Sequence, residues 1–336
     1  MSIYGVRGVR GVRGVRGVRG VRGVRGVRGV RSEGTDDFYA DAYHSPYLGD
    51  AINSARSGVI GADPWAAQPR PEPPDSPVSL GNNIFRWAPE YRYDLMLRSL
   101  MNGISFDASG NVARVDLVGG SDIRITQPAV RDLQKPDQIG VVLNAARLRA
   151  EREAEINVQT DDILPFLGAV VNLNPDRHEH TIQMLEAVHS AVVLCHQRVK
   201  HILSVPRPSE LDPRVQPMIP VPGHGSCPSG HAAEIEALRV VFLNFLAAAW
   251  DIETKQKDGV NVSYFTVIAQ QFERHAERIA FNRIVAGVHY PVDNEAGGEL
   301  GMKLAVYFNY WLTADPILKQ IWIAALGEWN DPPRFP

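Results

Sequence analysis

Apolar residues recur every three or four positions through most of the chain after residue 138, which is the spacing of helices that bury one face. The segment 178–200 places these residues on one face: Met184, Leu185, Val188, Ala191, Val192, Cys195 and Val199. The segment 229–250 repeats the pattern with Ile235, Leu238, Val241, Phe242, Phe245 and Leu246. Further helices are expected at 138–155, 161–172, 263–282 and 292–313. The sequence therefore predicts a mainly α protein, with a helical-bundle domain over 131–336.

The beginning of the chain has a composition that opposes packing, because residues 5–31 are nine tandem Gly-Val-Arg triplets. Glycine in every repeat and like-charge repulsion favour disorder, and the lack of proline argues against a collagen triple helix. We predict a disordered tail over 1–31, with a functional basic arm as the alternative. Since the whole chain carries −3 and the repeat +9, the remainder carries −12, and nucleic acid is not expected as a partner.

Residues 32–130 are expected to wrap around the bundle. The stretch 32–79 is rich in Ala, Gly, Pro and Asp, which is typical of a linker or an extended surface segment. Residues 104–126 alternate apolar and polar side chains around the turn signal Ala108-Ser109-Gly110. This pattern predicts a small β-hairpin in the N-terminal part.

Cysteine content and the length of the apolar segments bear on the cellular setting. Cys195 and Cys227 are too few for a disulfide framework, and both are expected to be buried. The N-terminus lacks the apolar stretch of a secretory signal, and the longest apolar segments are shorter than the roughly 20 residues that span a bilayer. We therefore expect a cytoplasmic or otherwise soluble protein with no signal peptide and no transmembrane segment.

Two short blocks near the middle of the chain carry residues that bind anions. In the first, Lys200 lies at a helix end and Arg207 follows between two prolines, which restrict the direction of the chain. In the second, Ser229 offers a hydroxyl and Gly230 an approachable amide at a helix start, where the helix dipole favours negative charge. His231 follows in the first turn. Taken alone, the first block is explained by a solvated surface pair and the second by a plain N-cap.

A third block supplies another cation and a second imidazole. Arg283 and Gly287 precede His289, and Asp293 lies four residues further on. A carboxylate there can accept the Nδ1 proton of His289 and leave Nε2 available as a ligand or nucleophile, although a lone His near an Asp is more often structural. Together the three blocks predict a site that strips a phosphate-like ion of water, holds it and attacks it.

Other polar residues beside these blocks receive simpler interpretations. Glu234 and Glu236 are expected to interact with the positive end of the helix dipole. Gln197 lies one turn before Lys200, on the same helix face, and is a candidate to line the cavity.

In order and spacing, the three blocks resemble a superfamily that contains the vanadium-dependent haloperoxidases and the type-2 phosphatidic-acid phosphatases. The shared pattern is Lys-x6-Arg-Pro, then Pro-Ser-Gly-His, then Ser-Arg-x3-Gly-x-His-x3-Asp. Only the serine before Arg283 departs from it, being Asn282 here, and this change affects local hydrogen bonding at most. The resemblance covers residues 200–293 and implies the helical bundle of the haloperoxidase and acid phosphatase type.

The resemblance also implies a cofactor and a role for each residue. In a haloperoxidase, His289 would coordinate vanadium as the metal ligand, His231 would be the acid–base group, and Lys200 would polarise bound peroxide. In a phosphatase, His289 would take up the phosphoryl group and His231 would protonate the leaving alcohol. The residues implied to hold vanadate are Lys200, Arg207, Ser229, Gly230, Arg283 and His289.

Within the superfamily, the lack of predicted spans and of an export signal, together with the long N-terminal region, favours a haloperoxidase. His224, seven residues before His231, resembles the histidine that bromoperoxidases have there, where fungal-type chloroperoxidases have an aromatic residue. The resemblance therefore implies oxidation of bromide or iodide by hydrogen peroxide to hypohalous acid, which halogenates small organic acceptors. It also implies a homo-oligomer. His224 as a plain polar residue at the rim stays an alternative.

Two other functions remain open on the sequence alone. The first is a soluble acid phosphatase that acts through a phosphohistidine. The second is a non-catalytic module that only binds an oxyanion, although binding needs cations and amides and does not explain both His231 and His289.

Overall fold

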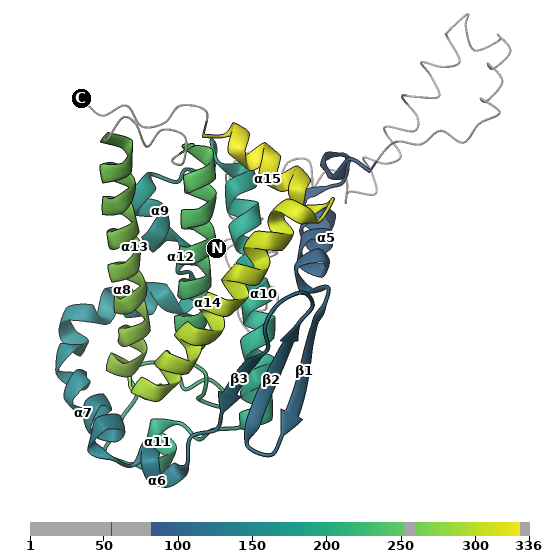
Figure 1. The fold of residues 1–336 in the computed structure, drawn as a ribbon. Coiled ribbons are helices and arrows are strands. Elements are labelled where there is room, and N and C mark those ends of the chain that lie inside the picture. The colour runs from purple at the N-terminus through teal and green to yellow at the C-terminus, as the bar shows by residue number, and fades with distance from the viewer. Residues whose placement is uncertain (1–54, 56–81, 252–259, 330–336) are drawn as a thin grey trace, which may run out of the picture.

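The computed structural model of the chain describes residues 82–251 and 260–329, together with the single residue Ala55. This part is mainly helical and carries one small antiparallel sheet, which confirms the predicted fold class (Figure 1). The helices are α5 (Pro89–Met101), α6 (Val130–Leu133), α7 (Val141–Ala145), α8 (Arg149–Asp161), α9 (Leu164–Val171), α10 (Glu179–Leu203), α11 (Pro208–Leu211), α12 (Gly230–Ala249), α13 (Val260–Val285), α14 (Pro291–Ala314) and α15 (Leu318–Gly327). The strands are β1 (Ile104–Ser109), β2 (Val112–Leu117) and β3 (Ile123–Thr126). The predicted tail 1–31 and the stretch 32–79 lie outside the described residues.

Most of the predicted helices are confirmed, with differences at their ends. The expected segments 178–200, 229–250, 263–282 and 292–313 correspond to α10, α12, α13 and α14, and 161–172 corresponds to α9. The expected helix 138–155 is instead a succession of the end of a π-helical turn (Pro136–Gly140), α7, a short 3-10 turn and α8, although the backbone keeps helical dihedral angles at the junctions. Helices α5 and α15 were not predicted. No helix in the described ranges has both the length and the apolar character needed to cross a bilayer.

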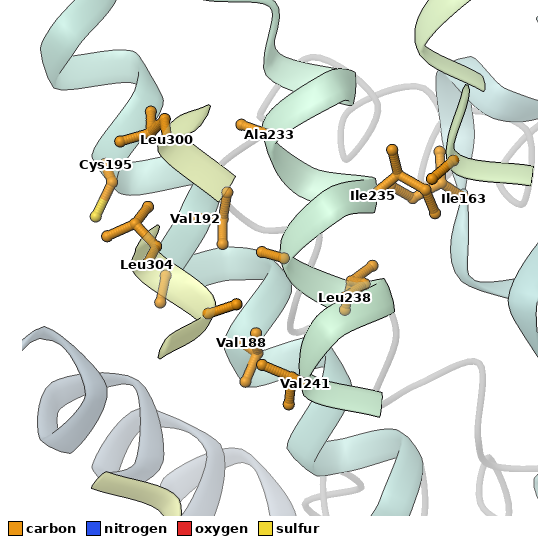
Figure 2. Packing of buried hydrophobic residues seen from close by; sticks show 14 of the residues in the cluster. Ile163, Val188, Val192, Cys195, Ala233, Ile235, Leu238, Val241, Leu300 and Leu304 are labelled. Atoms are coloured by element: carbon orange, nitrogen blue, oxygen red, sulfur yellow. The ribbon is translucent and has the colours of Figure 1, made fainter. Parts of the chain in front are cut away.

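The core lies where α10, α12, α13 and α14 pack together. Figure 1 shows α10, α12 and α13 side by side with α14 crossing them, and α12 contacts each of the other three. Val192 of α10, Leu238 of α12 and Leu304 of α14 are fully buried members of this core (Figure 2). Each buried side chain of this kind stabilises the fold by about 1.5–3 kcal/mol.

Helices α12 and α14 approach each other so closely that only glycine fits at two positions of α14. A Cβ added at Gly297 would lie 2.5 Å from the main-chain oxygen of Ser229, and one at Gly301 would overlap the carbonyl of Ala233. The close contact lets the Ser229 amide donate a 2.8 Å hydrogen bond to the main-chain oxygen of Asp293. The second and third sequence blocks are therefore tied together through the backbone.

The predicted β-hairpin is the first part of a three-stranded sheet with the order β1-β2-β3. Strands β1 and β2 turn at Gly110, which has a φ of 58°, and they pair antiparallel from Ile104 opposite Leu117. A second turn at Gly119, with a φ of 76°, brings β3 back along β2. Both turns need a left-handed backbone that glycine adopts without strain, and the second one was missed in the sequence.

Candidate functional site

The predicted site residues converge at the end of the bundle where α10 and α13 finish and α12 and α14 begin, the lower end in Figure 1. A small cavity of about 50 Å³ lies there. Its wall includes Lys200, Arg207, His224, Gly230, His231, Arg283 and His289. It adjoins a larger vestibule of about 1080 Å³, and both are lined by Gln197, Lys200, Arg207, Pro222 and His224. Ser229 and Asp293 are fully buried beside the cavity.

Three cationic side chains are buried at this cavity. Lys200, Arg207 and Arg283 are each at most 2% exposed. The ammonium of Lys200 donates to the main-chain oxygens of Ser226, at 2.7 Å, and Gly225, at 3.2 Å. Burial, followed by repulsion from Arg207, lowers the pKa of Lys200 to about 7. Burying cations is costly, so their concentration here favours an anion that compensates them.

Arg207 connects two loops of the site. Its backbone is extended, with φ −76° and ψ 158°, as the flanking prolines predict. The guanidinium donates from Nη1 to the main-chain oxygen of Val288, at 2.6 Å, and from Nε to that of His224, at 3.2 Å. Nη1 also lies 3.1 Å from Nε2 of His289. Arg207 therefore holds the two loops that carry His224 and His289.

His289 is held in one tautomer by the residues around it. Its Nδ1 lies 3.0 Å from Oδ2 of Asp293, which also accepts a hydrogen bond from the Ser226 hydroxyl. Because a carboxylate accepts and the guanidinium of Arg207 donates, the network assigns the proton to Nδ1 and the lone pair to Nε2. Burial, followed by the charge of Arg207, holds the pKa of His289 well below its usual range. Burial raises the pKa of Asp293, and the hydrogen bond from Ser226 opposes this shift.

The start of α12 offers unused donors. Ser229 is at the N-cap, but its side chain makes no capping hydrogen bond, and its buried Oγ has no hydrogen-bond partner among the described residues. A Cβ at Gly230 would lie 3.0 Å from Cε1 of His196 and 3.1 Å from Oε1 of Glu234, so a side chain would press into the cavity wall. A plain N-cap does not explain Ser229. The hydroxyl and the helix start instead fit a bound oxyanion such as vanadate or phosphate.

His231 and Arg283 meet on the side of the cavity formed by α8. Nε2 of His231 lies 2.8 Å from the main-chain oxygen of Gln159. Because a carbonyl only accepts, Nε2 carries a proton, and the 3.4 Å approach of Arg283 Nη1 to the same nitrogen is not a hydrogen bond. Arg283 donates from Nη2 to Oε1 of Gln159, at 3.0 Å, and to the main-chain oxygen of Ile156, at 3.2 Å.

The expected role of Glu234 and Glu236 at the helix dipole is wrong, because neither lies in the first turn of α12. The Glu234 carboxylate lies 3.0 Å from Nε2 of His189 and 2.8 Å from Nε2 of His196, both on α10. These hydrogen bonds help to hold the pKa of Glu234 well below its usual range although burial opposes this. Glu236 instead pairs with Arg239, one turn later. Glu234 thus joins α12 to α10 at the cavity wall.

His224 lies where the cavity and the vestibule meet. Its Nδ1 is 3.1 Å from Nη2 of Arg207. Burial, followed by the charge of Lys200, lowers the pKa of His224 to about 4, so the imidazole is neutral at pH 7. Gln197 lines the same junction, as the sequence indicated. Cys195 and Cys227 are buried and free, as expected.

Several residues that build this site had no signal in the sequence. Gln159, Ser226, His189 and His196 each contact a site residue or its neighbour across at least 38 positions of the chain. The one usable hint was in α10, where His189, His196 and Lys200 are spaced by seven and four residues and therefore share a helix face. Gly287 has a φ of 79°, and a Cβ there would lie 2.9 Å from Nη2 of Arg149, which explains why this position is glycine.

Comparison with known proteins supports the superfamily at the coarse level. Residues 181–316 match the family model described as the PAP2 superfamily, and this range contains all the predicted site residues. Members of this superfamily are usually enzymes, among them phosphatases and haloperoxidases. No curated protein is similar enough to the chain to count as a match. Helix α8, with Gln159, lies before the matched range.

Proposed function

We propose that the protein uses vanadate to oxidise bromide and iodide with hydrogen peroxide, and that the hypohalous acid formed halogenates small organic acceptors. The observation that carries this proposal is the position of His224, a neutral imidazole at the junction between the small cavity and the vestibule. A neutral ring at this junction does not compete with the cavity's cations for an anion. The volume of the vestibule leaves room for a halide to approach.

The residues of the cavity fit vanadate. Lys200, Arg207 and Arg283 would neutralise its oxygens, the hydroxyl of Ser229 and the amide of Gly230 would donate to it, and His289 would be the metal ligand. When bound, vanadate supplies the chemistry that activates hydrogen peroxide for transfer of an oxygen to a halide. The unpartnered Oγ of Ser229 and the lone pair on Nε2 of His289 both support this assignment. Arg207 would have to turn Nη1 away from that lone pair and toward the ion.

The proton chemistry would fall to His231 and Lys200. His231 is half-buried and lies in the first turn of α12, where it can exchange a proton with an oxygen of the bound ion. Lys200, with a pKa lowered to about 7, would donate a hydrogen bond that polarises peroxide. A general acid or base works best when its pKa lies near the working pH, which suits Lys200 to reaction near neutrality.

A phosphatase acting through a phosphohistidine is the second candidate, and the His289–Asp293 pair favours it. A histidine that keeps its lone pair on Nε2 through a carboxylate on Nδ1 is suited to attack phosphorus as well as to bind vanadium. In that reaction His231 would protonate the leaving alcohol.

Metal analysis after incubation with and without orthovanadate, followed by halogenation of monochlorodimedone with hydrogen peroxide, tests the proposal. We expect one vanadium per chain at saturation and vanadate-dependent turnover with bromide and iodide but much less with chloride. Chlorination as fast as bromination would contradict the role of His224. Phosphate-ester hydrolysis without any vanadate-dependent turnover would favour the phosphatase. Vanadate binding with neither activity would leave a binding module.

A further inference from the structure

Gln159 of α8 is fully buried and contacts both functional groups on its side of the cavity. Its side-chain oxygen accepts from Nη2 of Arg283 at 3.0 Å. Its main-chain oxygen accepts from Nε2 of His231 at 2.8 Å. One residue from outside the matched superfamily domain therefore touches both the third cation and the proposed acid–base group.

The orientation of the Gln159 amide is fixed by donors on two sides. Nη1 of Arg152 donates to Oδ1 of Asn282 at 3.1 Å, so Nδ2 of Asn282 faces Gln159 and donates to its Oε1 at 3.1 Å. Arg283 donates to the same oxygen. Because both neighbours are donors, the amide oxygen and not the nitrogen faces them. Asn282 is the one position where the chain departs from the superfamily pattern, and its amide completes this chain of hydrogen bonds.

We propose that Gln159 is a positioning residue of the oxyanion site: its side-chain amide aims the guanidinium of Arg283 and its main-chain carbonyl sets the proton of His231 on Nε2. The chemistry of the acceptor matters. A carboxylate at this position would orient Arg283 equally well but would cancel its charge, whereas a neutral amide oxygen orients the guanidinium and leaves the charge available to an anion. Asn282 supports the amide in this role.

The inference rests on the proposal that the cavity binds a tetrahedral oxyanion, but not on vanadium or halide chemistry. Sulfate is a suitable probe because it stays divalent across the useful pH range. Its dissociation constant, measured by titration calorimetry on the full-length protein, reports on Arg283 without any turnover. If the wild-type protein binds sulfate but does not oxidise bromide, the proposed function is contradicted and this inference is not.

The main variant is Gln159→Leu, and Gln183→Leu is the matched control. Gln183 is 1% exposed on α10, about 25 Å along the helix from Lys200 at 1.5 Å per residue. We expect both variants to lower the melting temperature, but only Gln159→Leu to weaken sulfate binding, by about tenfold, because a hydrogen bond to a charged group is lost. Asn282→Ala should weaken binding in the wild-type background and add little in the Gln159→Leu background. Wild-type affinity in folded Gln159→Leu, or equal weakening in both leucine variants, overturns the proposal.

Gln159→Glu separates positioning from simple filling of space, and it also serves if Gln159→Leu does not fold. Glutamate keeps the volume and the acceptor oxygens, so the variant should keep most of its thermal stability. It should nevertheless bind sulfate more weakly than Gln159→Leu, because it cancels the charge of Arg283. If Gln159→Glu binds sulfate as the wild type does, Arg283 does not depend on Gln159 and the proposal is wrong. The proposal also fails if the wild-type protein binds no sulfate.

Discussion

The two histidines of the site are anchored by different kinds of partner. His289 is 4% exposed and bound through Nδ1 to the buried carboxylate of Asp293, which Ser226 also contacts. His231 is half-buried and bound through Nε2 to the neutral main-chain carbonyl of Gln159. His289 is therefore anchored by a buried carboxylate, and His231 by a neutral amide carbonyl. The surroundings of these two histidines are the two regions compared below.

The difference bears on what each imidazole can do. A carboxylate on Nδ1 keeps the lone pair of His289 on Nε2, and burial beside Arg207 keeps the ring uncharged. This suits a ligand or a nucleophile that must not change its protonation. A neutral carbonyl holds the His231 ring in place without fixing its charge, which suits a group that takes up and releases a proton. The assignment of roles therefore follows from the anchors and can be tested through them.

Replacing each histidine with alanine should separate the two roles by the largest margin. We expect His289→Ala to lose retained vanadate, because the proposed metal ligand is gone. His231→Ala should keep much of its vanadate and lose bromide oxidation by about 10²–10⁴-fold, the usual contribution of a general acid or base. Equilibrium dialysis with orthovanadate and the bromination rate give the two readouts. If both variants lose vanadate equally, His289 and His231 do not have separate roles in binding and in proton transfer.

Asp293→Asn tests the anchor of His289 directly. Asparagine keeps the shape but removes the charge that favours a proton on Nδ1, so Nε2 loses its lone pair in part of the molecules. We expect vanadate affinity to fall by about 10–100-fold, as when a partner of a metal-binding histidine is lost, with little change in sulfate affinity. Glu328→Gln is the control, because Glu328 accepts hydrogen bonds from the His180 and Thr181 amides, away from the cavity. A parallel loss of sulfate binding would mean that Asp293 acts on the whole cavity.

The two regions also differ in how far the sequence predicts them. His289 and Asp293 are four residues apart, so their contact follows from local spacing and was expected before the structure. Gln159 meets Arg283 across 124 positions, and a single glutamine on an amphipathic helix carries no sign of its partner. The Ser226–Asp293 contact likewise spans 67 positions. Local blocks thus predicted residues that line the cavity and the nearby partner Asp293, but not the partners that lie far away in the sequence.

The fold shows the same limit. Long helices such as α10 and α12 were predicted because many apolar residues keep one phase over 20 or more positions. Helix α15, which has ten residues, was not predicted. Gly297 and Gly301 are required because the main-chain oxygens of Ser229 and Ala233 lie so close to them. The sequence of α14 alone therefore does not predict its close contact with α12.

Lys200 gives the site a pH dependence through its own ammonium group. The charged form of lysine is protonated, and burial lowers the pKa of Lys200 to about 7, so the ammonium loses its proton as the pH rises through that value. Sulfate affinity should therefore fall by about tenfold between pH 6 and pH 8, with uptake of a proton on binding at pH 8. Calorimetry in two buffers of different ionisation enthalpy measures both effects. Lys200→Arg should bind sulfate without this dependence, since arginine stays charged. A dependence that survives in Lys200→Arg would assign the titration to another group.

We expect the smallest effect at Ser226. Its hydroxyl donates to Asp293, whereas its main-chain oxygen accepts from Lys200. Ser226→Ala removes one of the donors to Oδ2 of Asp293 but leaves the main-chain oxygen that accepts from Lys200. The loss of one hydrogen bond to a buried carboxylate should lower stability by about 1–2 kcal/mol and weaken vanadate binding a few-fold. Ser99→Ala, at a buried serine of α5, should affect stability only. If Ser226→Ala reduces vanadate affinity as much as Asp293→Asn does, the carboxylate is not the main anchor of His289. The position of His289 would then depend on its whole hydrogen-bond network and not on the charge of Asp293, so His289 and His231 would differ in their networks and not in the charge of one partner.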